Sequence, residues 1–239
     1  MTFLWVTLTT LCILQVSFLC TTIYLHRAIT HRGVDLHPAV AFLMHLELML
    51  FTGVVPREWA AVHRKHHHFT DKPGDPHSPV LLGLWAVLVG NFFLYRKEAR
   101  QPATILKYTP DYKPDLLDKV PVAGYGILLG LVILILLFGW AWGTAAWLAH
   151  AILYVIVNAM VNGLGHAVGY RTYENGATNL RWLAWISAGE GLHNNHHQYP
   201  SSARLSMRRM EFDPAWPVIR LLERLGLADI RPEPLAKAA

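Results

Sequence analysis

Residues 121–166 read PVAGYGILLGLVILILLFGWAWGTAAWLAHAILYVIVNAMVNGLGH, and this stretch decides the fold. It contains no Asp, Glu, Lys or Arg, and GWAWG (139–143) divides it into apolar segments at about 121–139 and 144–163. Each segment is close to the roughly 20 residues that a membrane-spanning helix needs. The stretch therefore predicts two transmembrane helices, and it ends in a histidine motif, NGLGH (162–166).

The composition extends this prediction to the whole chain. Of the 239 residues, 53% are hydrophobic, and the mean hydropathy is +0.28, which is typical of a membrane protein. Residues 1–25 carry no charge and predict a further span at about 3–24. We expect an all-α integral membrane protein with about three transmembrane helices in a single domain, 1–239. The net charge of +5 without a compact basic cluster favours membrane lipid, and not nucleic acid, as a partner.

Histidines gather in four short motifs, HRAITH (26–31), HRKHHH (63–68), NGLGH (162–166) and HNNHH (193–197). Neutral imidazole binds transition metals, and nine such side chains exceed what one ion can use, so we expect a two-metal site. Nitrogen ligands with positions open to oxygen favour iron. The candidate ligands are His26, His31, His63, His66, His67, His166, His193, His196 and His197, with Asn162 beside them.

The spacing within the motifs supports a shared site. His63, His66 and His67 lie at i, i+3 and i+4, so that a helix carries them on one face, and the last motif repeats this spacing. Asn162 and His166 are four residues apart. His26 and His31 are five apart, about 140° around an α-helix, so they converge only if the first span ends or unwinds between them.

The charges and the shared site together predict the orientation. All 21 Lys and Arg residues lie in 26–119 or after 164, which predicts a cytosolic helical cap from 26–119 and 164–239 and an active site on the cytoplasmic face. We expect the membrane to be a bacterial inner membrane. A crossing by the apolar stretch 38–55 would separate the first two histidine motifs. We therefore expect 38–55 and 79–95 to be interfacial helices.

The other histidines have simpler interpretations. His68 falls off the ligand face, His37 and His45 are expected at the interface, and His150 is expected to be packed in the last span. His77 is expected to hold a loop or to support a metal ligand.

At this point the chain resembles the membrane-bound fatty acid desaturases, specifically the acyl-CoA (stearoyl-type) delta-9 branch. The resemblance rests on HRAITH, EWAAVHRKHHHFTDKPGDPHSP, NGLGHAVGYRTYENGATN and GEGLHNNHHQYPSSAR, in this order, and it covers nearly the whole chain. It implies a mushroom-like helical enzyme whose cap holds two iron ions through the nine histidines, with Asn162 as a ligand through water. The implied reaction uses O2 and two electrons to introduce a cis double bond at a mid-chain position, expected to be delta-9, of an acyl-CoA.

Other expectations follow from the resemblance. Arg96 and Lys97 align roughly with a basic pair at the CoA-binding surface of the family, whereas Ala61 and Val62 replace an Arg-Asp pair of the eukaryotic relatives. The chain contains no heme or iron–sulfur domain, so an external electron donor is expected, a ferredoxin or a cytochrome b-type protein with its reductase. From its spacing along the first span, Phe18 is expected to help close the tunnel that binds the acyl chain.

Several alternatives remain open. The substrate can be an acyl group on a glycerolipid, and a related histidine-box hydroxylase is a further possibility. A membrane metal transporter or metal-binding protein is a non-enzymatic alternative, but transporters place ionisable residues near the midplane of their spans. A soluble zinc hydrolase is disfavoured because the chain has no HExxH motif.

Overall fold

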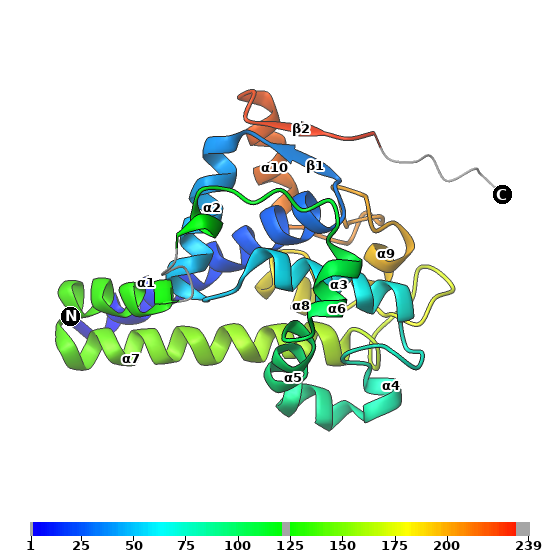
Figure 1. Cartoon of the computed structure of the whole chain (residues 1–239), viewed down its shortest axis with the longest axis horizontal. Coiled ribbons are helices and arrows are strands. Elements are labelled where there is room, and N and C mark those ends of the chain that lie inside the picture. The colour runs from blue at the N-terminus through cyan, green and yellow to red at the C-terminus, as the bar shows by residue number, and fades with distance from the viewer. Residues whose placement is uncertain (1, 121–124, 233–239) are drawn as a thin grey trace.

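The structure, a computed structural model, describes residues 2–120 and 125–232 and is mostly helical (Figure 1). The two ends of the molecule differ in character. Long apolar helices extend to the left of Figure 1, whereas short helices and loops gather at the other end. The elements are α1 (Thr2–Cys20), η1 (Thr21–Thr30), β1 (Val34–Leu36), α2 (Pro38–Phe51), α3 (Pro56–Phe69), α4 (Pro79–Leu82), α5 (Leu84–Ala99), α6 (Pro102–Tyr108), η2 (Leu117–Lys119), α7 (Gly126–Leu164), α8 (Arg181–Ile186), α9 (His193–Gln198), α10 (Ala215–Arg224) and β2 (Ala228–Ile230).

The long element α7 is a helical hairpin. Gly139 has φ +80° and ψ 162°, a conformation that glycine adopts without strain and that interrupts the helix. The chain then folds back, so that the Trp147 indole N–H donates to the carbonyl oxygen of Ile127 at 3.1 Å. Gly143 packs so closely on the backbone of Leu134 that a Cβ would lie 2.4 Å from its carbonyl oxygen. The two apolar segments of the sequence therefore lie side by side, although residues 121–124 of the first predicted span lie outside the described residues.

Two helical elements of the described chain are long and apolar enough to cross a membrane, Phe3–Thr30 and Gly126–Leu164, and the second of them is the element that folds back at Gly139. Helices α2 and α3 are bent by 91° relative to each other. If this pair counts as one broken span, the described chain has up to three candidate spans. The first of these helices is longer than the predicted 3–24, because η1 continues α1 as a π-helix. Its i→i+5 bonding places residues five apart on neighbouring turns, and the His31 N–H donates to the His26 carbonyl oxygen at 3.0 Å.

Other boundaries also differ from those that the sequence predicts. The stretch 38–55 is helical only to Phe51, and 79–95 is divided into α4 and α5 at Gly83, where φ is +90°. A short antiparallel sheet, in which Val34 pairs with Ile230 and Leu36 with Ala228, departs from a purely α-helical fold. It forms because Val34 and Ala228 bury their side chains against α10.

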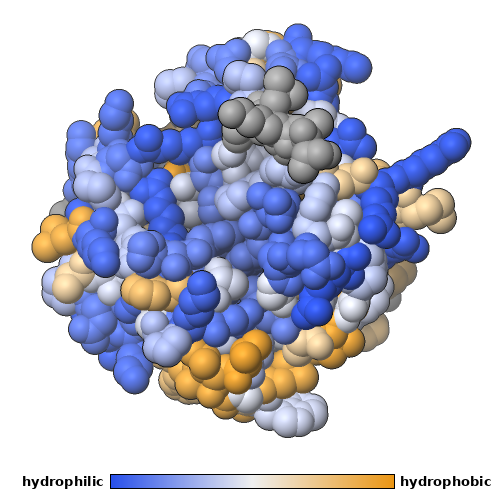
Figure 2. Space-filling view, turned by 90° about the vertical axis from the view of Figure 1, so that its right-hand side faces the viewer, coloured by the Kyte–Doolittle hydropathy of each residue, from blue (hydrophilic) through white to orange (hydrophobic). Residues whose placement is uncertain are grey.

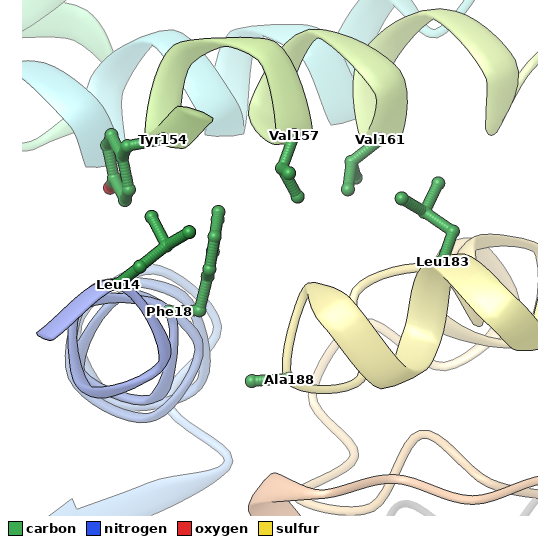
Figure 3. Packing of buried hydrophobic residues seen from close by; sticks show 7 residues of the cluster. All are labelled: Leu14, Phe18, Tyr154, Val157, Val161, Leu183 and Ala188. Carbon is green, nitrogen blue, oxygen red and sulfur yellow. The ribbon is translucent and has the colours of Figure 1, made fainter. Parts of the chain in front are cut away.

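The helical core lies between α1, α7 and α8. Figure 3 shows Leu14 and Phe18 of α1 facing Tyr154, Val157 and Val161 of α7, with Leu183 and Ala188 completing the cluster. The rings of Phe18 and Tyr154 stack at 5.2 Å between centroids. This core fixes the end of α7 from which the third histidine motif continues.

Candidate metal centre

The structure brings all nine candidate histidines together in two adjoining groups. In each group the potential ligand atoms lie within 4.8 Å of one another. The first group is His26, His31, His63, His67 and His196, and the second is His66, His166, His193 and His197. The expectation that the four motifs converge is therefore met at the level of geometry.

Helices α3 and α9 each contribute to both groups. On α3, His63 and His67 belong to the first group and His66 to the second. On α9, His196 belongs to the first group, and its neighbour His197 belongs to the second. The i, i+3, i+4 spacing puts three side chains on one broad face, and this face lies across the boundary between the groups.

The π-helix explains how the first motif contributes two ligands. His26 lies within η1 and His31 directly follows it. Their ring centroids are 4.8 Å apart, so the unwinding that the five-residue spacing requires is supplied by i→i+5 turns.

The Nε2 atoms point inward at metal-ligand spacing. In the first group, Nε2 of His196 lies 3.0 Å from that of His26 and 2.8 Å from that of His67. In the second group, Nε2 of His193 lies 3.0 Å from that of His166 and 3.1 Å from that of His197. Neighbouring ligands on one ion with metal–nitrogen bonds of about 2.1 Å are separated by about 3 Å, so both groups fit a metal ion.

Carboxylates hold three of these rings from behind. His26 Nδ1 lies 2.8 Å from Glu190, His66 Nδ1 lies 2.9 Å from Asp75, and His166 Nδ1 lies 2.9 Å from Asp71. A carboxylate that accepts the Nδ1–H leaves the Nε2 lone pair free for a metal. The sequence interpretation did not identify these carboxylates, although Asp71, Asp75 and Glu190 each lie only a few residues from a histidine motif.

The electrostatics of the site favour neutral imidazoles. Burial, with the neighbouring rings, lowers the pKa of His193, His196 and His197 well below its ordinary value. Burial alone would raise the pKa of Asp75, but its hydrogen bond with His66 lowers it to about 2. Neutral imidazole is the form that binds metal, and ionised aspartate is the form that supports it.

The asparagines of HNNHH hold α9 in place. Asn194 Oδ1 accepts from the backbone N–H groups of Thr172 and Tyr173, and Asn195 Nδ2 donates to Glu211 at 2.8 Å. Both asparagines are fully buried. A helix of six residues is therefore kept in register by side chains that bind no metal themselves.

The other histidines lie outside the two groups. His68 is exposed, His37 accepts from the Ala39 N–H at the start of α2, and His150 lies 3.0 Å from Ser17. His45 pairs with Asp115 at 2.7 Å. His77 stacks on His66 with 4.5 Å between ring centroids, so it supports a candidate ligand, as expected.

A cavity of about 370 Å³ adjoins both groups. His63 of the first group and His193 of the second line it, together with Glu190. Phe18 and Tyr154 form part of the wall, and the role of Phe18 in closing a tunnel stays a prediction. The cavity therefore reaches a candidate ligand of each group.

Of the remaining candidate residues, two line this cavity and one does not. Asn162 lines it and donates to Asn91 at 3.0 Å, one helical turn before His166. Arg96 also lines it and pairs with Glu58 at 3.3 Å. Lys97 is exposed and is not among the described residues that line the cavity, so the structure separates the two members of the basic pair.

Comparison with known proteins identifies relatives over nearly the whole chain. The model of a family described as "Fatty acid desaturase" matches residues 3–224. The chain is 34% identical over 219 residues to an sn-1 stearoyl-lipid 9-desaturase of Anabaena variabilis, covering 87% of this chain and 76% of the relative. It is 32% identical to Delta-9 acyl-lipid desaturase 2 of Arabidopsis thaliana, covering 87% and 68%. It is also 34% identical to an acyl-CoA C20 Delta5-desaturase of Anemone leveillei, covering 87% and 67%.

Proposed function

The chain belongs to the fatty acid desaturase family, and from this premise we propose that it introduces a cis double bond, at delta-9, into a fatty acyl chain. Membership makes it an oxidoreductase of a membrane-bound family that uses iron. The observation that carries the finer proposal is the cavity, because it reaches His63 of one group and His193 of the other.

We assign the two histidine groups to two iron ions. The five-histidine group would hold one ion, and the four-histidine group, with Asn162 through a water molecule, would hold the other. The iron supplies the oxidising power to remove hydrogen from an unactivated methylene. In the overall reaction the chain loses two hydrogen atoms and gains a C=C bond. O2 takes up these two hydrogen atoms, together with two electrons from the donor and two protons, and becomes two molecules of water.

The side chains of the protein position the acyl chain and exclude water from it. Phe18, Tyr154 and Val161 offer an apolar wall for an alkyl chain, and they exclude water from the carbons that react. Glu190, Asp71 and Asp75 keep the Nε2 atoms aimed at the metals. The nine histidines of the two groups form what we call the histidine cage. With the apolar wall beside it, this cage can hold one methylene of the acyl chain at a fixed place, which a position-specific desaturation needs.

For the group that carries the acyl chain, we propose a membrane glycerolipid. Acyl-CoA bears several phosphate charges, yet Arg96, the one described cation in the cavity wall, is already paired with Glu58. Beside it, α4 and α5 expose large apolar side chains, among them Trp85 (76% exposed), Val89 (79%) and Phe93 (72%). Figure 2 shows an apolar area along the lower edge of a largely hydrophilic face, at the height where Figure 1 has α4 and α5. Such a surface suits an approach from the lipid phase.

Acyl-CoA is the second candidate. It is favoured by the basic pair Arg96 and Lys97 and by the acyl-CoA relative. In either case we propose that the protein lies in a bacterial inner membrane, and the distribution of Lys and Arg supports a cap that faces the cytoplasm. There it receives electrons from a ferredoxin or a cytochrome b-type protein with its reductase.

Expression in a bacterial host that lacks desaturases tests the proposal. We expect a new cis mono-unsaturated fatty acid in the total lipids by gas chromatography–mass spectrometry, and none with His196→Ala. A hydroxylated product, or no product from folded protein supplied with reductant, would contradict it. Labelled stearoyl-CoA and labelled phospholipid, given separately to isolated membranes, then distinguish the two candidate substrates.

A further inference from the structure

The inner face of α5 carries two polar side chains one helical turn apart, Asn91 and Tyr95, and both line the cavity. Asn91 is paired, since its Oδ1 accepts from Asn162. Tyr95 is different: its hydroxyl oxygen is buried and has no hydrogen-bond partner within the described chain. A buried hydroxyl without a partner is unfavourable, so a polar group of a ligand is the natural complement.

Tyr95 lies in the part of the cavity wall that α5 forms. The lining residues beside it on α5 reach the surface, because Phe92 is 48% exposed and Arg96 is partly exposed. Among the other lining residues, Phe18 is 2% and His193 is 1% exposed. The Tyr95 hydroxyl therefore lies in a cavity whose wall includes both surface residues of α5 and members of the two metal groups.

Two other lining residues have buried nitrogens that lack a partner in the described chain, His77 and His193. His193 belongs to the second metal group, and His77 stacks on His66 of that group. A carbonyl held there would bring the first carbons of the acyl chain, and not its middle, to the metals. Tyr95 is neither a member of a metal group nor stacked on one, so a carbonyl bound to its hydroxyl does not face this problem.

We propose that the Tyr95 hydroxyl donates a hydrogen bond to the carbonyl oxygen of the acyl group and so sets which carbons lie beside the metals. The inference rests on the proposed desaturase function. The carbonyl is the one strong acceptor that a saturated acyl chain carries into the cavity, whether it belongs to an ester or a thioester. Burial raises the pKa of Tyr95, so the hydroxyl keeps the proton that it donates.

The test is Tyr95→Phe, which removes only the hydroxyl, with Tyr108→Phe as the matched control. The Tyr108 hydroxyl is also buried and unpaired within the described residues, but it does not line the cavity. Each variant is expressed in the desaturase-free host, and double-bond positions are read by mass spectrometry of dimethyl disulfide adducts. This distribution does not depend on how much protein accumulates, and a merely structural role would leave it unchanged.

We expect Tyr95→Phe to give a mixture of positional isomers and a KM about 3- to 10-fold higher, the loss typical of one hydrogen bond, with unchanged thermal stability. The Tyr108→Phe enzyme should match the wild type. A single isomer at the wild-type position with an unchanged KM in Tyr95→Phe would overturn the inference. If the wild type itself forms no unsaturated product, the proposed function fails, and the assignment of Tyr95 fails with it.

Discussion

The histidine cage and the acyl cavity lie against each other but are built in opposite ways. In the cage, three of the imidazoles are held from behind by carboxylates, and pairs of Nε2 atoms such as those of His193 and His166 or His196 and His67 lie about 3 Å apart, as ligands of one ion require. In the cavity, the exposed wall area is mainly apolar, and single polar atoms such as the Tyr95 hydroxyl have no partner in the described chain. Substitutions in the cage should therefore abolish product formation, whereas substitutions in the cavity wall should change which product forms.

The largest effect is expected for a candidate ligand. His193→Ala should reduce product formation by more than about 100-fold, because it removes a ligand that also faces the cavity. His68→Ala is the control, since His68 is exposed in the second motif but belongs to neither group. Product yield per amount of folded protein measures the difference, and equal loss in both variants would break the distinction between ligand and bystander.

An intermediate effect is expected for a carboxylate that supports a ligand. Asp75→Asn should lower metal affinity by about 10- to 100-fold, because an amide no longer holds His66 in the required tautomer. Iron retention during titration with a chelator measures this. Asp35→Asn, in an exposed ion pair with Arg231, serves as the control and should retain iron like the wild type. Normal retention in Asp75→Asn would mean that the cage does not depend on its carboxylates.

The smallest effect on rate, but a change of product, is expected for the wall of the cavity. Phe18→Ala should lengthen the space beside Tyr154 and shift the preferred acyl length upward, by up to about 10-fold in the ratio of longer to shorter products. Phe18→Leu, which leaves less of a void, covers the case in which the alanine variant is unstable. Chain-length profiles from cells measure the shift. The control is Phe93→Ala, at an exposed position on α5, which should leave the chain-length profile unchanged. If both Phe18 variants also keep the wild-type profile, Phe18 does not select the acyl length.

Much of the cage could be predicted from the sequence, because residue spacing on a helix determines which side chains share a face. The triplets in α3 and α9 are such a case. Their division between two groups could not be predicted, since it depends on how two helices from distant parts of the chain meet. For His26 and His31 the prediction was partial. Their five-residue spacing indicated that the helix must end or unwind between them, but not that it would do so as the π-helix η1.

The contacts of Glu190 and Asp71 and the shape of the cavity were harder to predict for the same reason. Glu190 reaches His26 across 164 positions of sequence, and no local pattern marks that contact. The exposure of Lys97 beside the lining residue Arg96 depends on how α5 is rotated, which the sequence pattern left open. Long-range packing decides these positions.

The number of iron ions per chain tests the central claim most directly. Wild-type protein purified from iron-replete cells, with iron measured by inductively coupled plasma mass spectrometry against protein by amino-acid analysis, should contain two iron ions per chain, one for each histidine group. One iron ion per chain, or none in folded protein after reconstitution with ferrous iron, would contradict the two-metal cage on which the proposed desaturation depends.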